Sequence, residues 1–447
     1  MVDTIIIGGG LSGLSAAVDL AARGFSVTII EQRPHLGGRT YSFVDPSTGD
    51  PVDNGQHLMM GCYHATRWLL KTIGSDHLAT LQPNLHIDFV HPRLGTSSLH
   101  CPSLPSPLHL MAGLIGLRSL SLRDRLRLLK VGLAIRKEPK DMEPHLASLT
   151  VHQWLDQLGQ SEENKKYLWD IIAIGSLNDD PKSVSALLFY RVLRSAFLGT
   201  REDSSLLVPR VGLTELFVNP AVAFLRSRGG EIILNNGVDE NLVEGSALKG
   251  VRCSDGEVRE ARTFISAVPW YAASPLLSHA PGTGGWIVNG HLSSSPIVTI
   301  NLWFDRTVMD EDFVALLDSR VHWVFNKSKI YGLNNQSRQY LSLVISGAGP
   351  LVLVSSGELV EGALRELHKA LPRTGAARLM HSLVIKERRA TFSPRPDVEQ
   401  HRPSSKTPLE NLFLAGDWTN TGYPATIEGA VLSGRKAAEG VAEVLRR

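Results

Sequence analysis

The first 31 residues read as a strand, a glycine-rich turn, a helix and a second strand. Residues 5–7 form the continuous apolar run expected of a buried parallel strand, and an apolar face at helical spacing precedes the next strand at 27–30. Gly8, Gly10 and Gly13 fit G-x-G-x-x-G. In such a unit the glycines permit the tight turn, the approach of a pyrophosphate and the packing of helix on strand. We therefore predict a dinucleotide-binding unit.

Glu31 ends the second strand, about 20 residues beyond the glycine turn, where a carboxylate accepts hydrogen bonds from ribose hydroxyls. The plain alternative is a tight turn without a ligand, but strand, helix, second strand and acid all occur together. We predict a Rossmann-like site whose phosphates lie at the start of the helix, at Leu11 and Ser12. Backbone amides and the positive end of the helix dipole favour anions there.

A second small-residue turn, Gly37-Gly38, follows the acid and lies between two arginines. An extended flavin dinucleotide runs beyond the first loop, so these arginines can bind its pyrophosphate; the alternative is a basic surface loop. The pattern resembles the FAD-binding amino terminus of the flavin amine oxidase and phytoene desaturase superfamily. We therefore predict FAD as the cofactor. The expected contacts in this part are Glu31, Gln32, Arg33, Gly37, Gly38, Arg39 and Thr40.

The carboxyl terminus carries a second set of candidate residues. A short apolar strand at 412–415 leads into a Gly-Asp turn, and an amphipathic helix begins near Thr426. Such a helix often serves packing alone. In the superfamily that the chain resembles, the aspartate contacts the ribityl chain and the helix faces the flavin, where its positive end stabilises negative charge. The resemblance adds Gly416, Asp417, Thr426 and Ile427, and places the backbone of Val238 at adenine.

The stretch VDNGQHLMMGCYHAT gathers two histidines, a cysteine and an aspartate. Cys62 and His64 would point oppositely on a strand, and no C-x-x-C or H-E-x-x-H spacing accompanies them. We therefore predict no metal site, and we expect Cys62 to be a buried, inert thiol. In the superfamily, the chain returns across the flavin ring at this point. The resemblance thus adds Gly55, Gln56, His57 and Leu58 to the expected FAD contacts.

Longer strings narrow the resemblance. GRTYSFVDPSTGDPVDNGQHLMMGCYHAT, HWVFNKS and AGDWTNTGYPATIEGAVLSG are together similar to the squalene-associated FAD-dependent desaturases, the hydroxysqualene dehydroxylase family. That resemblance implies reductive conversion of hydroxysqualene to squalene in bacterial hopanoid biosynthesis. Three alternatives stay open, because a fold does not set the direction of its chemistry: oxidative isoprenoid desaturation, amine oxidation, and a flavin-free prenyl-binding escort module.

Removal of an allylic hydroxyl needs a proton for the departing water and a hydride for the carbon, which the flavin would supply. His57 titrates near neutrality and is the candidate catalytic acid, with Lys327 as a second candidate. The sequence contains no second G-x-G-x-x-G and no paired redox cysteines. The electron donor is therefore unidentified, and transient binding of NAD(P)H, a partner protein and a coupled oxidation all stay open.

Composition limits the compartment and the partners. Lys+Arg 46 against Asp+Glu 44 gives no general attraction to nucleic acid, which we exclude as a partner. Three well-separated cysteines indicate a reducing compartment rather than a disulfide framework. No apolar run reaches the roughly 20 residues that span a bilayer. We therefore expect a cytoplasmic protein that acts on a hydrophobic isoprenoid.

Residues 108–137 combine an apolar patch with a basic helix. Between Arg118 and Lys140 there are eight Lys/Arg against two acids, and leucines at 122, 126, 129 and 133 form an apolar stripe. Such a helix suits an anionic membrane surface, here the inner face of the plasma membrane. The alternative is a core helix with a solvated basic face.

The chain is long enough, at 447 residues with 43% hydrophobic content, for two or more domains. We predict an α/β fold of the amine-oxidase type with two interleaved domains. The first is a discontinuous Rossmann-like FAD-binding domain, and the second is an α+β substrate-binding domain. The expected boundaries are 1–64, 201–274 and 401–447 for the first, and 65–200 and 275–400 for the second.

Overall fold

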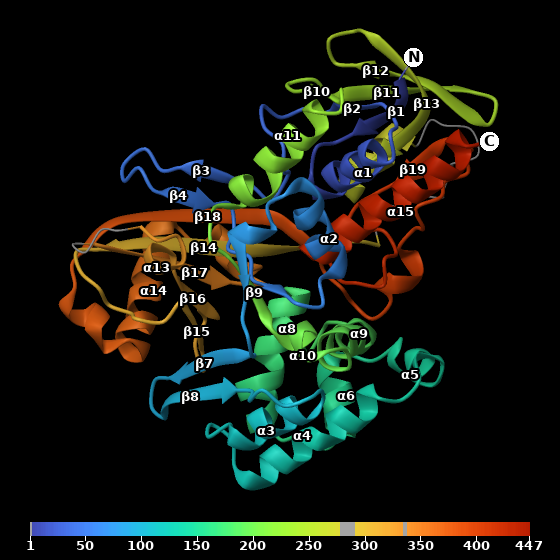
Figure 1. Cartoon of the computed structure of the whole chain (residues 1–447). Coiled ribbons are helices and arrows are strands. Elements are labelled where there is room, and N and C mark those ends of the chain that lie inside the picture. The colour runs from blue at the N-terminus through green and yellow to red at the C-terminus, as the bar shows by residue number, and fades with distance from the viewer. Residues whose placement is uncertain (1, 278–290, 334–337) are drawn as a thin grey trace.

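A computed structural model describes residues 2–277, 291–333 and 338–447. One seven-stranded sheet unites segments from both ends and the middle of the chain (Figure 1). Its strands β2, β1, β13 and β19 run parallel, as the buried apolar runs predicted. In spatial order the strands are β10 (Glu231–Ile233), β2 (Val27–Ile30), β1 (Val2–Ile7), β13 (Val258–Ser266), β12 (Ala247–Cys253) and β11 (Val238–Glu244), with β19 (Leu412–Leu414) beside β13.

Helices α1 (Leu11–Ala22) and α15 (Ile427–Leu445) pack side by side against this sheet (Figure 1). Their backbones approach so closely that a Cβ on Gly434 would lie 2.1 Å from the carbonyl oxygen of Ser12. The carboxyl-terminal helix is therefore held directly against the helix that follows the glycine turn. Helices α2 (His64–Ile73) and α11 (Asn219–Arg226) complete the same apolar cluster.

A second seven-stranded sheet forms the other half of the molecule, and helix α14 (Ser356–Ala370) covers one of its faces. A capping box at Ser355 and Glu358 starts that helix. The sheet's two longest strands, β18 and β14, pair along most of their length. The strand order is β18 (Leu379–Phe392), β14 (Ser294–Phe304), β17 (Gln339–Ile345), β16 (Trp323–Asn326), β15 (Phe313–Leu316), β7 (His86–His91) and β8 (Gly95–His100).

A helical layer packs against β7, β8, β15 and β16 and encloses an apolar core with them. Ser121 caps α4 and Ser185 caps α9, each accepting a backbone N–H of the first turn. None of the helices in the described ranges is long and apolar enough to cross a bilayer. The layer contains α3 (Leu108–Gly116), α4 (Leu122–Ile135), α5 (Pro139–Leu146), α6 (Val151–Gln157), α8 (Asp170–Leu177) and α9 (Ala186–Phe197).

Short strands join the halves: β3 (Ser42–Val44) pairs with β4 (Pro51–Asp53), and β9 (Leu206–Pro209) lies between β5 (Met59–Met60) and β6 (Ala79–Leu81). The predicted boundary at residue 65 falls inside α2, which packs with α1 and α15. We keep the division into two domains as a proposal, with α2 assigned to the first. The proposed 275–400 segment includes 278–290 and 334–337, which lie outside the described residues.

Candidate active site

A cavity of about 1280 Å³ begins at the glycine turn after β1 and continues to strands β7, β8 and β16 and helices α8 and α9. Ordinary small-molecule sites have volumes of about 300–1,000 Å³. The cavity therefore has room for a large ligand, or for two ligands that meet within it. Its first part is polar and glycine-rich, and its far part is walled by apolar side chains.

The glycine turn has the geometry of an anion site. Gly8 takes a φ of +102°, and a Cβ on Gly13 would lie 2.0 Å from the carbonyl oxygen of Gly8. By contrast, the nearest atom to a Cβ on Gly10 would be 4.0 Å away, so the space beside Gly10 is open. Helix α1 begins there without a side-chain cap, which leaves its first amides for a ligand.

Glu31 joins the two glycine loops. Its Oε2 accepts the N–H of Gly9 at 2.7 Å, and its Oε1 accepts the N–H of Arg33 at 2.9 Å. The carbonyl of Gly9 in turn accepts the N–H of Gly37 at 2.8 Å. The carboxylate therefore fixes the shape of the cradle, besides its predicted contact with a ribose.

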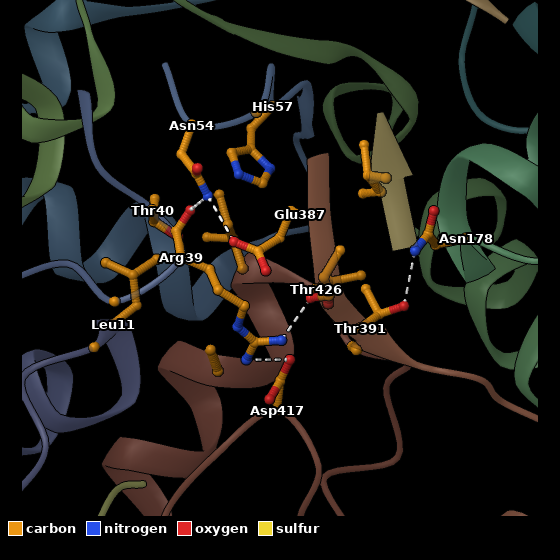
Figure 2. A pocket seen from close by; sticks show the side chains of 18 of the residues that line it. Leu11, Arg39, Thr40, Asn54, His57, Asn178, Glu387, Thr391, Asp417 and Thr426 are labelled. Atoms are coloured by element: carbon orange, nitrogen blue, oxygen red, sulfur yellow. Dashed lines mark hydrogen bonds and ion pairs between the residues drawn. The ribbon is translucent and has the colours of Figure 1, made fainter. Parts of the chain in front are cut away.

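Asp417 lies where the two ends of the chain meet. Arg39 binds its Oδ2 at 2.8 Å and also donates to the carbonyl of Ala390 at 2.6 Å (Figure 2). The other carboxylate oxygen, Oδ1, is buried and has no hydrogen-bond partner among the residues that the structure describes. A ribityl hydroxyl would supply the missing donor, because buried polar atoms are rarely left unpaired.

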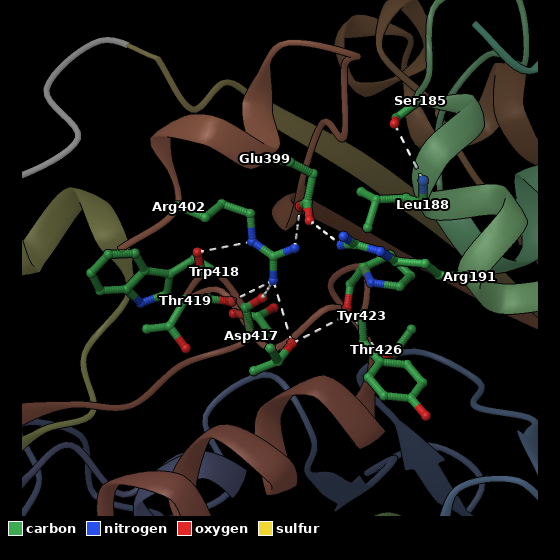
Figure 3. Close-up of polar contacts among 12 residues, drawn as sticks. Ser185, Leu188, Arg191, Glu399, Arg402, Asp417, Trp418, Thr419, Tyr423 and Thr426 are labelled. Carbon is green, nitrogen blue, oxygen red and sulfur yellow. Dashed lines mark hydrogen bonds and ion pairs between the residues drawn. The ribbon is translucent and has the colours of Figure 1, made fainter. Parts of the chain in front are cut away.

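The loop that carries Asp417 is held by a buried arginine. Arg402 donates to the backbone carbonyls of residues 417–419, and Glu399 accepts from Arg402 and from Arg191 (Figure 3). This arrangement fixes Asp417 from behind. Together with the open space at Gly10 and the uncapped start of α1, it fits a dinucleotide with ribityl hydroxyls, which is FAD.

The stretch after β4 is supported by a buried ion pair. Lys327 Nζ lies 2.8 Å from Asp53 Oδ2, and the side chains are 1% and 4% exposed. Lys327 also donates to Gln56 Oε1 at 2.5 Å, and Tyr331 donates to Asp53. Because an ammonium only donates, the amide oxygen of Gln56 must face it. Burial would raise the pKa of Asp53, but Lys327 and its other donors lower it below the ordinary value.

Lys327 therefore lies behind Gln56, whereas Gln56 and His57 line the cavity. Burial lowers the pKa of His57 to about 4; Asp53 opposes the shift, and Arg39 and Lys327 add to it. The imidazole is thus neutral near pH 7. It can orient a ligand through hydrogen bonds, but it does not hold the proton that a catalytic acid must donate.

The depressed pKa of His57 predicts a pH-dependent stability. Between its folded pKa of about 4 and its ordinary value of 6.5, the unfolded state binds the extra proton. The contribution of His57 to the free energy of unfolding should therefore be fully present above pH 6.5. It should be lost as the pH falls toward 4. His57→Gln should flatten this part of a plot of Tm against pH. His322 has a similarly depressed pKa, so His322→Gln is the matched comparison; an unchanged slope in the His57 variant would contradict the burial argument.

The predicted cofactor contacts gather in one place: all except Gly13 line the cavity, and Gly13 instead packs against Gly8. Cys62 is buried, and desolvation raises the pKa of its thiol to about 12. His64 begins α2 and lies 3.2 Å from Asp203. No group of three metal-binding side chains occurs among the residues that the structure describes.

Sequence reasoning missed Glu387, which lies on β18 and lines the cavity with Asn54 and His57 (Figure 2). It lies within KERRAT, whose charges resemble an exposed strand, so no local signal marks it. Sequence reasoning also named no residues for the apolar part of the cavity. It is walled by Leu85, Ile87, Phe89, Leu99, Leu168, Ile171, Ile172, Val192, Leu193, Phe197, Ile297, Trp323 and Phe325.

Known proteins resemble this chain in sequence and in fold. A hydroxysqualene dehydroxylase from Sinorhizobium fredii is 30% identical over 97% of both chains. A 15-cis-phytoene desaturase from Synechococcus elongatus is 26% identical over 98% of this chain and 95% of its own. The solved structure of cyclohexylamine oxidase from Brevibacterium oxydans IH-35A superimposes with a TM-score of 0.69 at 21% identity over the full length of both.

The sequence pattern of the flavin containing amine oxidoreductases matches residues 11–442. The predicted amine-oxidase-like α/β fold is thereby confirmed, as is the resemblance to hydroxysqualene dehydroxylases. A flavin-free escort module is no longer a competing interpretation. From its glycine turn to its last helix, the chain belongs to the family of flavin-containing amine oxidoreductases, and it is a FAD-dependent oxidoreductase.

Proposed function

We propose that the enzyme acts in isoprenoid metabolism and reduces hydroxysqualene to squalene, the step that hopanoid biosynthesis requires. The observation that carries the proposal is the form of the cavity: a dinucleotide cradle opens directly into a long apolar space. A C30 hydrocarbon chain needs such a space, since burying its methylene groups drives binding at roughly 0.8 kcal/mol each. The relative from Sinorhizobium fredii supports the choice of substrate.

Bound FAD would supply the hydride, and the chain's own residues would orient the substrate and keep water out of the cavity. The apolar walls hold the hydrocarbon and exclude water. Gln56, fixed by Lys327, presents its amide N–H₂ on the side away from the lysine, and it donates to the carbonyl of His57 at 3.2 Å. The neutral His57 offers one donor and one acceptor to orient a hydroxyl. We propose this orienting role for His57 in place of proton donation.

Oxidative desaturation of an isoprenoid is the second candidate, because a 15-cis-phytoene desaturase matches over nearly the same length. The two candidates share the cavity and differ in the direction of electron flow. Reductive dehydroxylation consumes a reduced flavin and needs an acid, whereas desaturation starts from the oxidised flavin. An experiment therefore has to determine the direction of electron flow between flavin and substrate. That direction decides whether the enzyme needs an electron donor.

Anaerobic incubation of the photoreduced enzyme with hydroxysqualene tests the proposal. We expect squalene to form in proportion to reduced flavin, with return of the oxidised flavin spectrum. The oxidised enzyme should leave hydroxysqualene unchanged. Formation of a more unsaturated product by the oxidised enzyme, with no squalene from the reduced one, would establish the desaturase instead.

We also propose that helices α3 and α4 rest on an anionic membrane surface. More than half of the exposed large apolar side chains of the described residues lie between 94 and 133, and Leu122, Leu126 and Leu133 are 55–66% exposed. Arg123 and Lys130 add basic groups to the same helix, and Lys137 adds another just beyond its end. The two helices lie at the end of the molecule remote from α1 (Figure 1).

This surface lies directly outside the apolar part of the cavity. A Cβ on Gly113, on the inner side of α3, would lie 3.3 Å from a methyl group of Leu99, which lines the cavity. Met111 and Ile115 of the same helix are exposed. One helix thickness therefore separates the cavity wall from the proposed membrane contact, and a lipid substrate would have a short path between them.

Charge removal from α4 and from Lys137, just beyond its end, should weaken membrane binding. Each basic residue near an anionic surface contributes about 1 kcal/mol. The triple change of Arg123, Lys130 and Lys137 to Gln should thus lower the affinity for anionic liposomes by about 100-fold at low salt, as measured by sedimentation. Added salt should weaken wild-type binding as well, because the screening length is about 10 Å at 0.1 M.

Arg125 and Arg127 are left intact because they bind the carbonyls of residues 115 and 120 and the carboxylate of Asp124. The control changes Lys249, Lys369 and Lys406 to Gln, which removes the same charge from exposed sites elsewhere. Equal loss in both variants would mean that only net charge matters. Wild-type protein that ignores anionic liposomes at low salt would refute the membrane contact.

A further inference from the structure

The proposed dehydroxylation requires a proton donor, and the cavity offers few. Among the lining residues that the structure describes, the carboxyl groups are Glu31, Asp239, Asp417 and Glu387. Glu31 accepts two backbone N–H groups, Asp417 is bound by Arg39, and Asp239 accepts from Ser254 beside the turn at Gly237. These three belong to the cradle.

Glu387 is bound more weakly. Its Oε2 accepts from Asn54 Nδ2 and its Oε1 from the N–H of Arg389, both at 3.3 Å. Neither partner is charged, and both distances lie at the long end for hydrogen bonds. Arg39 is near enough to interact with the carboxyl electrostatically, but its own N–H groups are directed to Asp417 and Ala390. The carboxyl group is therefore free to bind a ligand.

The backbone places Glu387 where the two parts of the cavity meet. Along β18 the pairing with β14 jumps from Ser295↔Thr391 to Ile297↔Glu387, so residues 388–390 bulge out of the ladder. Bulges of this kind re-aim side chains beside active sites. Directly paired residues project from the same face. Glu387 therefore lies beside Ile297, which packs with the apolar core, and it also lies near Asn54 and Arg39 (Figure 2).

The other groups at this junction are less suited to the role. Tyr271 also lines the cavity, but it is 40% exposed and its ring lies against the guanidinium of Arg389. His57 is neutral, with its pKa at about 4. Lys386 donates to the carbonyl of Val354, and arginine does not deprotonate in proteins. Burial raises the pKa of Tyr63. Burial lowers the pKa of Lys327 and Asp53 opposes the shift, but Lys327 is bound to Asp53 and does not line the cavity. The geometry points to Glu387 as the catalytic acid of the reaction proposed above, on which this inference rests.

The step balances as follows in atoms and electrons. The carboxyl proton of Glu387 passes to the substrate hydroxyl oxygen while the carbon–oxygen bond breaks and its electron pair leaves with the oxygen as water. Bound reduced FAD would be the two-electron reductant and would supply the hydride, with its electron pair, to the allylic carbon. Glu387 is left as a carboxylate beside Asn54 and takes its next proton from solvent. Asn54 acts as a positioning residue, since its amide holds the carboxyl group.

Glu387→Gln keeps the shape and removes the proton. With photoreduced enzyme and hydroxysqualene, single-turnover dehydroxylation should fall by about 10²–10⁴-fold, the usual contribution of a general acid. The acetate ester of hydroxysqualene should restore turnover to within a few-fold of wild type, because acetate leaves without a proton. Glu361→Gln, on the surface of α14, is the matched control and should change neither rate.

A binding measurement tests the position without turnover. An analogue with an ammonium group in place of the hydroxyl should bind the oxidised wild-type enzyme at least tenfold more tightly than the Gln variant, followed by flavin absorbance. FAD affinity should be equal in the two. If the Gln variant folds poorly, Glu387→Asp replaces it and should give a smaller loss with the same ester rescue.

Three results would overturn the assignment: dehydroxylation by the Gln variant at the wild-type rate, equal losses with alcohol and ester, or equal binding of the ammonium analogue. Failure of the wild-type enzyme to dehydroxylate hydroxysqualene would instead refute the proposed function. The ammonium titration would still report where Glu387 lies, so the two failures are distinguishable.

Discussion

Replacing Lys327 by Met should lower the free energy of unfolding by about 3–5 kcal/mol, as expected when one partner of a buried ion pair is removed. The variant leaves the Asp53 carboxylate buried with donors from Ser42 and Tyr331 but no cation. Urea unfolding of the FAD-free protein measures the effect without a contribution from the ligand. Lys329→Met, on the same α13 (Lys327–Ile330) but half exposed, should cost less than about 1 kcal/mol.

The double variant Asp53→Asn/Lys327→Met separates the pair from its parts. Asn keeps an oxygen for Ser42 and the N–H of Leu213, and its amide N–H₂ can donate to the hydroxyl oxygen of Tyr331. Because Asn carries no charge, the cost of an uncompensated buried charge disappears. We expect the double variant to regain more than half of the lost stability. If the double variant is as unstable as the sum of the singles, the two side chains do not act as a pair.

The same pair explains a limit of the sequence interpretation. Lys327 was a candidate acid because it occurs in a motif, WVFNKS, but its partner Asp53 is 274 residues away. A contact of that separation leaves no periodic or spacing signal in one sequence. In the structure Lys327 lies behind Gln56 and binds its side chain. Gln56 lines the cavity, and Lys327 does not.

The proposed cofactor cradle leaves a clearer pattern in the sequence than the buried ion pair does, for a physical reason. Its parts are local: a turn that needs glycine, a helix start that needs bare amides and an acid one strand away. Each part requires certain residue types within a few positions of each other, so the pattern can be recognised in a single sequence. The ion pair between Arg39 and Asp417 was not predicted, because nothing local in either segment specifies the other. Only the family resemblance assigned Asp417 to the cofactor site.

The charge state of His57 and the role of Glu387 could not be inferred from residue type. A histidine in water titrates near 6.5, and only burial between Arg39 and Lys327 brings it to about 4. Glu387 is aimed into the cavity by a shift in strand register, which depends on the partner strand β14. Both properties belong to the assembled environment, and for that reason the predicted acid and the inferred one differ.

The glycine turn has two functions: it packs α1 against the end of β1, and it leaves space for the pyrophosphate of FAD. Single substitutions at Gly13 and Gly10 should separate them. In Gly13→Ala the new Cβ would lie 2.0 Å from the carbonyl oxygen of Gly8 and 3.3 Å from the Cβ of Ala267. Backbone cannot yield as a side chain does, so α1 must move away from the end of β1. Overpacking of this kind costs about 1–3 kcal/mol or more. We expect the FAD-free protein to be destabilised by that amount and FAD affinity to fall at least tenfold.

Gly10→Ala should behave differently. Its Cβ would meet no atom nearer than Gly38 Cα at 4.0 Å, and its φ of −71° is open to any residue. The FAD-free protein should therefore keep its melting temperature, while the methyl group fills the space where the pyrophosphate approaches and FAD binding is lost. Gly132→Ala, in an open position on α4, should stabilise the fold by about 0.5–1 kcal/mol and leave FAD affinity unchanged. Wild-type FAD affinity in Gly10→Ala would mean that the phosphates bind elsewhere, whereas loss of folding would mean that the space beside Gly10 is already filled by the protein itself.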